Sequence, residues 1–239
     1  MKVVSFLFSL VAMAVAGAAL YQSSPKGLEK TLSGDPQILL NASKSVEKAL
    51  QEEARAKQEE AARQAEESIV KNLEAFNNDE SVPFTGPKDA KVVVVEFFDF
   101  ACGYCHALAP TLEELIDANA DVKFVFKPLA FLSRESAYAA SAFVAAQMQG
   151  KAYDFYKNVM AINDGLSEEK INKAAEKAGL DLAKMKEDME GKDVEAALRR
   201  TNELARQANI NGVPFLILNG KISHVIDKDG LQAAIDAEK

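Results

Sequence analysis

The sequence has few cysteines and no block of like charge. Among its 239 residues only two cysteines occur, Cys102 and Cys105, and both lie in one short motif. A scaffold held by disulfides needs several well-separated cysteines, so this class of fold is excluded. The net charge is −8 and no run of lysine and arginine stands out, which makes nucleic acid and anionic membrane surfaces poor candidate partners. The cysteine pair is therefore expected to be reactive, or to bind a metal or haem.

The N-terminus has the pattern of an export signal. It begins with Lys2, and an apolar run follows from Val3 to Leu20. A short basic start, an apolar centre and small residues at Ala16-Gly17-Ala18 are typical of a secretory signal peptide. An uncleaved membrane anchor is the alternative, because the run has the minimum length that spans a bilayer. No cysteine follows the run, so a lipid anchor there is excluded. We expect residues 1–20 to direct the chain to the periplasm or another exported location, with membrane association if the segment is retained.

Residues 21–79 are predicted to form a linker and a helical arm. The stretch from Tyr21 to Pro36 contains Ser, Gly and Pro, as linkers do. From Gln37 to Phe76 there is neither Gly nor Pro, and Ala, Glu, Lys, Gln and Arg dominate, which predicts one continuous helix. The arm is either a solvated spacer or a stalk whose apolar ends associate between chains. We expect a homo-oligomer formed through residues 21–76, without a long regular coiled coil.

A different composition begins at residue 80 and predicts an α/β domain with a helical block in its middle. Ser167 and Asp181 are expected to cap two of the helices in that block. Asn219-Gly220 is a strong hairpin signal. The expected elements are strands at Val92–Phe98 and Val122–Phe126, helices over Ser133–Ala208, strands at Gly212–Leu218 and Lys221–Ile226, and a helix at Asp227–Ala237.

Both cysteines lie between the first predicted strand and the helix that follows it. The apolar run ends at Phe100, and Cys102-Gly103-Tyr104-Cys105-His106 then opens a helical segment. A helix N-terminus offers unpaired N–H groups and the positive end of the helix dipole, and both stabilise a thiolate. Cys102 comes first in the motif, so we expect it to be the exposed nucleophile. Cys105 is then the buried partner that resolves a mixed disulfide.

Four chemistries compete for this motif, and dithiol–disulfide exchange is favoured. Covalent haem would use His106 as axial ligand, but the motif follows a valine-rich strand and no second haem element is evident. A zinc site lacks its usual second ligand pair, because the only other histidine is His224. An inert structural disulfide is the fourth. An exported binding or adhesin-like module is the non-enzymatic alternative, since a fold does not fix a function.

The segment Val95-Glu96-Phe97-Phe98-Asp99-Phe100, leading into Cys-x-x-Cys, resembles the DsbA family of exported thiol–disulfide oxidoreductases. The resemblance covers Ala90 to Lys239. It implies an α/β, thioredoxin-like fold with a helical insertion at about residues 133–208, in a catalytic domain of residues 80–239 that a helical arm precedes. On composition, the N-terminal extension resembles the oligomerising arms of ScsC-like and related surface-antigen members of that family.

The resemblance also assigns roles to residues. Cys102 matches the family's nucleophile and Cys105 its resolving cysteine. Val213-Pro214 resembles the loop in which a cis proline faces the active site and helps to hold the substrate chain. Gly103 and Tyr104, next to the nucleophile, are expected to contact the substrate with that loop.

Glu96 lies six residues before Cys102, where the family often has an acid beneath the site. A carboxyl on a buried strand has a raised pKa and can help to move the proton of Cys105. The alternative for Glu96 is a structural acid paired with a lysine.

The subtype signals conflict. Gly103-Tyr104 resembles the dipeptide of DsbC-type isomerases, whereas valine before Pro214 resembles the oxidases. We therefore expect isomerase activity, oxidase activity or both, through mixed disulfides at Cys102. The expected partners are exported client proteins with cysteines, a membrane redox partner and further copies of the chain. We expect no metal and no cofactor besides the redox-active Cys102–Cys105 disulfide.

Overall fold

The computed structural model describes residues 36–239. The predicted signal segment 1–20 and the linker residues 21–35 lie outside this range. The chain divides into two units, Met1–Glu60, of which residues 36–60 are described, and Ala61–Lys239.

The described part of the first unit is helical. Helix α3 (Pro36–Lys71) is 36 residues long, and its residues 43–60 are all exposed. Lys57 pairs with Glu53 at 2.8 Å and Arg55 with Glu59 at 2.7 Å, one helical turn apart in each case. Exposed pairs of this kind contribute little to the stability of a helix. The helix therefore depends mainly on its content of strong helix formers.

The predicted single helix Gln37–Phe76 is interrupted at Asn72. The Asn72 side chain donates a hydrogen bond to the backbone oxygen of Ser68 (2.9 Å), and the chain resumes as α4 (Leu73–Asn77). Asparagine side chains compete for backbone hydrogen bonds, which gives a physical reason for the break. Ile69 and Phe76, on either side of it, are fully buried in the core of the second unit.

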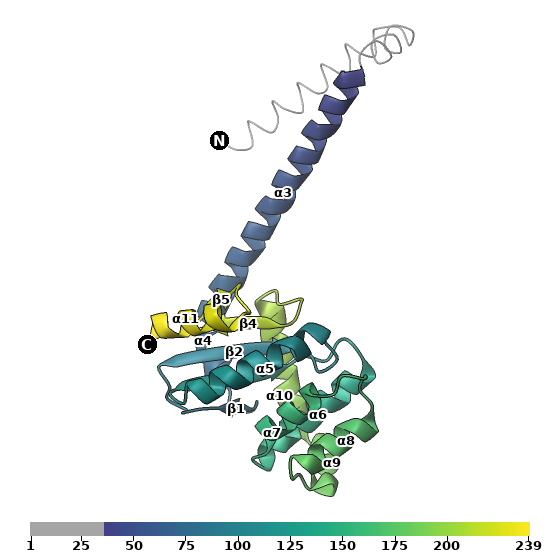
Figure 1. Cartoon of the computed structure of the whole chain (residues 1–239), viewed down its shortest axis with the longest axis vertical. Coiled ribbons are helices and arrows are strands. Elements are labelled where there is room, and N and C mark those ends of the chain that lie inside the picture. Colours follow the sequence, from purple (N-terminus) through teal and green to yellow (C-terminus); the bar gives the residue numbers. More distant parts are fainter. Residues whose placement is uncertain (1–35) are drawn as a thin grey trace. The chain divides into compact units, whose positions relative to one another are not determined.

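A five-stranded sheet forms the centre of the second unit, with the strand order β1-β3-β2-β4-β5 (Figure 1). Strands β2 and β3 are parallel, and the other neighbouring pairs are antiparallel. All seven residues of β2 are buried, as its valine-rich sequence predicts. The strands are β1 (Phe84–Thr85), β2 (Val92–Phe98), β3 (Val122–Pro128), β4 (Phe215–Leu218) and β5 (Lys221–Ser223).

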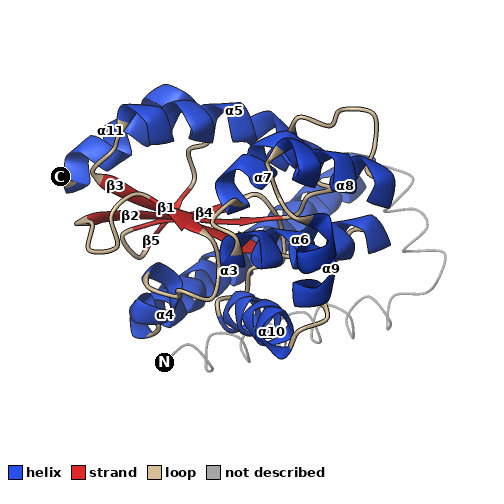
Figure 2. Ribbon diagram, turned by 90° about the horizontal axis from the view of Figure 1, so that it is seen from below, coloured by secondary structure: helices blue, strands red, loops and turns tan. Residues whose placement is uncertain are grey.

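Helices cover both faces of the sheet, with α5 and α11 on one face and α4 and α10 on the other (Figure 2). Because side chains alternate along a strand, Val94 and Phe98 of β2 join one hydrophobic cluster while Val95 and Phe97 join the other. The helices after β2 are α5 (Gly103–Ala118), α6 (Arg134–Met148), α7 (Ala152–Met160), α8 (Glu168–Lys177), α9 (Leu182–Met189), α10 (Lys192–Gln207) and α11 (Lys228–Glu238). Helices α6 to α10 lie between β3 and β4 and constitute the predicted helical insertion.

Most of the predicted element ends are confirmed. Ser167 accepts a hydrogen bond from the Lys170 amide, and Asp181 accepts two from the first turn of α9. Asn219 and Gly220 both have positive φ (47° and 83°), as a tight hairpin turn between β4 and β5 requires.

The return strand is shorter than predicted. It was expected to run from Lys221 to Ile226 and ends at Ser223. The Ser223 hydroxyl hydrogen-bonds to the backbone of Val225, and this local turn replaces the next rungs of the sheet.

Candidate active site

The cysteine motif opens helix α5 directly after the central strand. Cys102 is the N-cap residue, with an extended backbone (φ −82°, ψ 114°), and Gly103 is the first helical residue. The Cys102 amide donates to the Asp99 carbonyl at 2.9 Å, and the His106 amide donates to the Cys102 carbonyl at 3.1 Å. The Cys102 side chain therefore lies at the positive end of α5, the setting that stabilises a thiolate.

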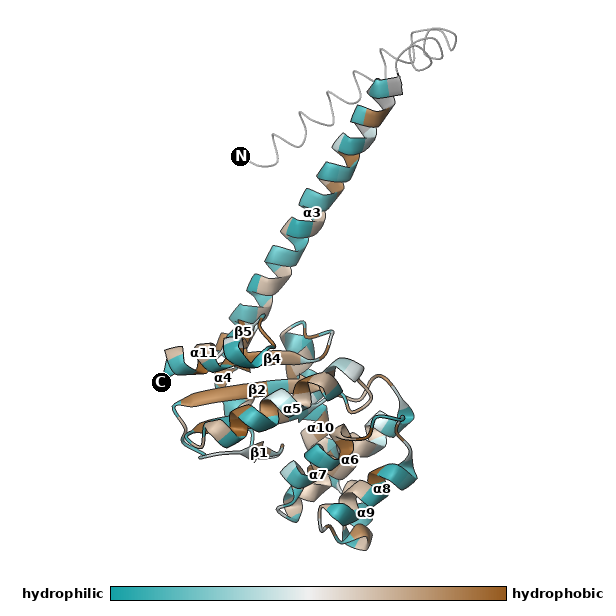
Figure 3. Cartoon of the chain, in the orientation of Figure 1, coloured by the Kyte–Doolittle hydropathy of each residue, from teal (hydrophilic) through white to brown (hydrophobic). Residues whose placement is uncertain are grey.

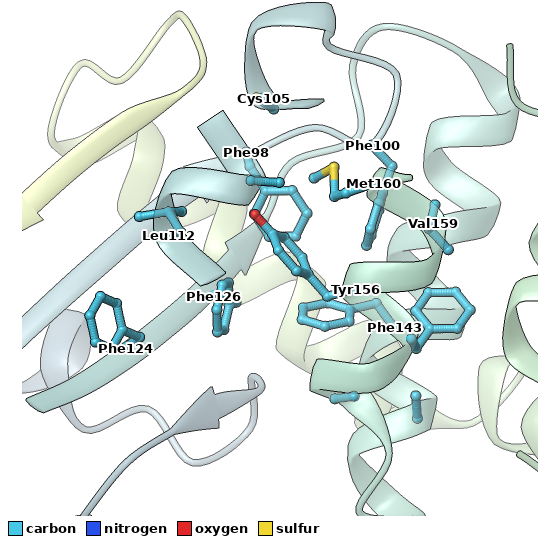
Figure 4. Close-up of a cluster of buried hydrophobic side chains, with 14 of the residues drawn as sticks. Phe98, Phe100, Cys105, Leu112, Phe124, Phe126, Phe143, Tyr156, Val159 and Met160 are labelled. Atoms are coloured by element: carbon cyan, nitrogen blue, oxygen red, sulfur yellow. The ribbon is translucent and has the colours of Figure 1, made fainter. Parts of the chain in front are cut away.

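The two thiols differ in their access to solvent. Both cysteines are free, Cys102 is 7% exposed and Cys105 is completely buried. Burial raises the pKa of the Cys105 thiol strongly, and the nearby Glu96 carboxyl adds to this effect. Cys105 lies beside the aromatic cluster of Phe98 and Tyr156 (Figure 4). Of the two thiols only Cys102 reaches the surface, and its exposed area is small.

The loop predicted to face the cysteines does so. The Val213–Pro214 peptide bond is cis. The Cys102 Sγ lies 3.5 Å from the Val213 carbonyl oxygen, to which the thiol donates. The structure thus brings Cys102 into contact with the Val213–Pro214 loop, as expected from the sequence.

Gly103 and Tyr104 lie at the surface beside Cys102. Tyr104 is 79% exposed, and apart from the adjoining residues and backbone of its own helix nothing lies within 4 Å of the position that a Cβ of Gly103 would take. A cleft of about 390 Å³ runs alongside, lined by Gly103, His106, Ser133 and Glu135 together with residues of the α7–α8 loop. Both predicted contact residues are accessible to a polypeptide.

Glu96 lies on β2, buried on the same face of the sheet as Cys105. The Tyr156 hydroxyl donates to its Oε2 at 3.0 Å. Burial raises the pKa of Glu96 to about 8, and the hydrogen bond from Tyr156 opposes this rise.

In the described part of the chain, Glu96 does not pair with a lysine. Its neighbour in β3 is Phe126. Lys123 and Lys127 alternate to the other face of the sheet. There Lys127, also fully buried, pairs with Asp79 at 3.1 Å. Glu96 is an acid without a neighbouring cation among the described residues.

Asp99 is a site residue that the sequence analysis did not identify. Its buried carboxylate accepts hydrogen bonds from the Ala101 amide (2.8 Å), the Phe131 and Leu132 amides (3.1 and 3.2 Å) and the Ser136 hydroxyl. Asp99 therefore fixes the cysteine turn to the β3–α6 loop. The signal in the sequence was the position of Asp99 between phenylalanines in a largely apolar run. An acid buried there must be hydrogen-bonded to other groups.

The geometry of His106 bears on the haem alternative. Its Nε2 lies 2.6 Å from the carbonyl oxygen of Phe100, and a carbonyl can only accept. In this arrangement Nε2 is protonated and is not free to coordinate iron. Within residues 36–239 there is also no group of three His, Cys, Asp or Glu side chains that could hold a metal ion.

The model of the DSBA-like thioredoxin domain family matches residues 93–236, which include the cysteine motif, Glu96 and Pro214. The chain belongs to this family. The expected fold, α/β and thioredoxin-like with a helical insertion and a helix before it, is confirmed.

Solved structures of similar proteins agree. A thioredoxin-like oxidoreductase from Silicibacter pomeroyi DSS-3 is 30% identical, with a TM-score of 0.64, over 69% of this chain and 95% of that one. ScsC of Proteus mirabilis, in a transitional conformation, is 26% identical, with a TM-score of 0.66, over 92% of this chain and 97% of that one. A periplasmic thioredoxin-like protein from Salmonella enterica serovar Typhimurium is 25% identical, with a TM-score of 0.61, over 70% and 94%.

Curated relatives are of two kinds. A probable disulfide bond formation protein D from Bacillus anthracis is 30% identical over 166 residues, 64% of this chain and 76% of that protein. A Na(+)/H(+) antiporter, NhaA 3 from Salinispora tropica, is 29% identical over 141 residues, 58% of this chain but only 22% of the antiporter. The chain thus spans about a fifth of that relative's length. The family match, the Silicibacter oxidoreductase and the Bacillus homologue together indicate an oxidoreductase enzyme.

Proposed function

We propose that the protein exchanges thiols and disulfides on exported client proteins through mixed disulfides at Cys102. The observation that carries this proposal is the contact of the Cys102 sulfur, at the N-terminus of α5, with the Val213 carbonyl, while Cys105 is buried behind it. A client chain that lies along the Val213 loop presents its sulfur to Cys102 and to no other sulfur of the protein.

In the oxidising direction the enzyme starts with a Cys102–Cys105 disulfide. A client thiolate attacks the sulfur of Cys102, a client–Cys102 disulfide forms and Cys105 leaves with the electron pair. The leaving sulfur takes a proton, and Glu96 is the proposed donor because it is buried beside Cys105. A second client thiolate then attacks the client sulfur of the mixed disulfide. The client leaves oxidised and the enzyme is reduced.

In the isomerising direction the enzyme starts reduced. The Cys102 thiolate attacks an incorrect client disulfide, one client thiolate is released, and the client's own thiols then displace Cys102. The number of disulfides does not change, so no external oxidant is consumed. Gly103-Tyr104 favours this direction by resemblance and Val213 favours the first, and we propose that the enzyme has one or both activities.

The helical arm is proposed to join copies of the chain. Leu40, Val46 and Leu50 of α3 are 44%, 58% and 61% exposed, and Val46 and Leu50 lie one turn apart on one side of the helix. Figure 3 shows a few hydrophobic positions on a helix that is mainly hydrophilic. Since the match to Proteus mirabilis ScsC covers 92% of this chain, it extends into the arm. Joining copies would present several active sites to one misfolded client.

The proposed location is the periplasm or another exported compartment. Support comes from the signal-like pattern of residues 1–20 and from the periplasmic protein of Salmonella to which the chain is similar. Among the residues that the structure describes, no helix has the length and apolar character needed to cross a membrane. A membrane protein is the proposed redox partner that reoxidises or reduces the cysteine pair, and no nucleic acid is expected to bind.

Two assays test the proposal, namely reduction of insulin and refolding of scrambled ribonuclease. Activity in either one that Cys102→Ser abolishes supports the enzyme, and the ratio of the two activities assigns the subtype. A wild-type protein inactive in both, with correct folding shown by circular dichroism, would instead favour an exported binding module.

A further inference from the structure

Tyr156 is a completely buried tyrosine of the helical insertion, and its hydroxyl donates to the Oε2 of Glu96. The other carboxyl oxygen, Oε1, has no hydrogen-bond partner among the described residues. We infer that Tyr156 is a positioning residue for the exchange reaction. This inference rests on the proposed role of Glu96. Its hydroxyl holds the Glu96 carboxyl so that Oε1 is free to exchange a proton with Cys105.

The Tyr156 ring has little freedom to move. It lies 4.8 Å from the Phe126 ring and 5.2 Å from the Phe98 ring, centroid to centroid, and it stacks on Tyr153 at 6.4 Å. Figure 4 shows the ring rising from α7 with its oxygen directed toward Phe98 and the Cys105 side of the cluster. Close-packed interiors hold side chains in one rotamer, so the hydroxyl stays on Glu96.

Among residues 36–239, no cation assists the Glu96 carboxylate. In the sheet, Glu96 lies between Phe126 of β3 and Leu216 of β4, both apolar. The titratable groups that act on the pair from the packed elements are Cys105 and Glu113 of α5. Tyr153 of α7 stacks on the Tyr156 ring. Lys157 of α7 pairs with Asp154 at the surface. Tyr156 is therefore the donor that stabilises the charged form of Glu96.

The proton balance of the resolving step requires such a group. Cys105 attacks the sulfur of Cys102 in the mixed disulfide, the Cys102–Cys105 bond forms, and the bond to the client breaks. The client sulfur leaves with the electron pair, so the client is reduced and the cysteine pair is oxidised. The proton of Cys105 passes to Oε1 of Glu96, and in the reverse step it returns. Burial makes each charged form costly, and a hydrogen bond to the carboxylate offsets that cost.

The experiment is a comparison of Tyr156→Phe with Tyr153→Phe. Phenylalanine at 156 keeps the packed ring and removes only the donor, which raises the pKa of Glu96 above its present value of about 8. Losing one hydrogen bond to a charged group shifts a pKa by about one unit. We therefore expect the pH profile of the resolving step, measured in single turnover, to move upward by about one pH unit. At neutral pH the variant is roughly tenfold slower. Tyr153→Phe removes a hydroxyl from the same helix that does not donate to Glu96, and its pH profile stays as in the wild type.

Glu96→Gln separates this inference from the proposed function. If it leaves the pH profile unchanged, the proton role of Glu96 is wrong. If it removes the pH dependence but Tyr156→Phe behaves like Tyr153→Phe, the role of Tyr156 is wrong. In the double variant we expect Tyr156→Phe to have no further effect, because the two residues act as one unit; a full additional tenfold loss would mark Tyr156 as merely structural.

A measurement on the wild type covers the case in which Tyr156→Phe does not fold. Infrared difference spectra between low and high pH contain a carboxyl band that Glu96→Gln removes. The expected band has the lowered frequency of a hydrogen-bonded carboxyl. A band at the frequency of a free carboxyl would overturn the inference.

Discussion

The sulfur of Cys102 lies 3.5 Å from the carbonyl oxygen of Val213, a residue 111 positions further along the chain. This contact joins the start of α5 to the loop before β4 at the reactive thiol. Because Cys105 is completely buried, a client reaches the cysteine pair through the surface around Cys102 and Val213.

The first prediction concerns the order in which the thiols react. In the reduced protein at neutral pH, iodoacetamide should modify Cys102 at least about tenfold faster than Cys105, because Cys102 lies at the helix N-terminus and burial raises the pKa of Cys105. Mass spectrometry of tryptic peptides measures both rates. Equal rates, or a faster Cys105, would show that the assignment of nucleophile and resolving thiol is reversed.

The second prediction concerns stability and pH. In the folded protein burial raises the pKa of Glu96 from 4.5 to about 8, so folding favours the protonated acid. The contribution of Glu96 to stability is therefore complete below pH 4.5 and is lost as the pH rises through 8. Glutamine cannot ionise and still accepts a hydrogen bond from Tyr156. Glu96→Gln should then be more stable than the wild type by an amount on the order of 3 kcal/mol at pH 7.

Denaturant unfolding at several pH values measures this difference. The gap between the two proteins should narrow toward pH 4.5 and close below it, where the wild-type acid is protonated in both states. Lys157→Met, a change at the surface of α7, serves as the control, and its difference from the wild type should vary little with pH. A Glu96→Gln gap that stays constant from pH 4.5 to 8 would contradict the buried, protonated acid.

The third prediction concerns Asp99, which accepts hydrogen bonds from three backbone amides and the Ser136 hydroxyl. Asp99→Ala leaves these donors without their acceptor, and we expect a loss of roughly 2–4 kcal/mol in unfolding free energy together with lower activity. Ser136→Ala removes only one donor and should cost about 1 kcal/mol. Equal effects of the two substitutions would mean that Asp99 does not organise the cysteine turn.

The fourth prediction concerns the arm. Val46→Glu with Leu50→Glu places charge on the exposed apolar residues of α3, so the mass from light scattering should fall from that of an oligomer to that of one chain. Arg55→Ala, on the same helix, is the control. Removal of residues 21–60 should have the same effect while it keeps Ile69 and Phe76 in the core. A wild-type mass of one chain would end the proposal of an oligomer.

Strand and helix periodicities, caps and the Asn219-Gly220 turn are local signals, and they were sufficient to predict an α/β core with a helical insertion. The thioredoxin-like fold was implied by the resemblance. Strand ends were predicted less well: β4 begins at Phe215, not at Gly212. Cys102, Cys105, Val213 and Pro214 could be named from one motif and one resemblance, and the structure brings them together. Glu96 was named because the resemblance implies an acid six residues before the nucleophile.

Partners supplied by distant segments could not be predicted. Tyr156 is 60 residues from Glu96, and its sequence context indicates only a buried face of a helix. The amides of Phe131 and Leu132, which bind Asp99, have no sequence signature because any residue supplies a backbone N–H. Composition placed the end of the arm at residue 79. In the structure Ile69 already contributes to the core of the unit that begins at Ala61.

The most direct test of Cys102 as nucleophile is to trap its client with Cys105→Ser in the exported protein. Without a resolving thiol the mixed disulfide persists, so we expect adducts on a non-reducing gel that dithiothreitol releases and whose linked peptide contains Cys102. The double variant Cys102→Ser, Cys105→Ser should give no adducts. If Cys105→Ser is folded and yields none either, Cys102 is not the nucleophile of a thiol–disulfide exchange.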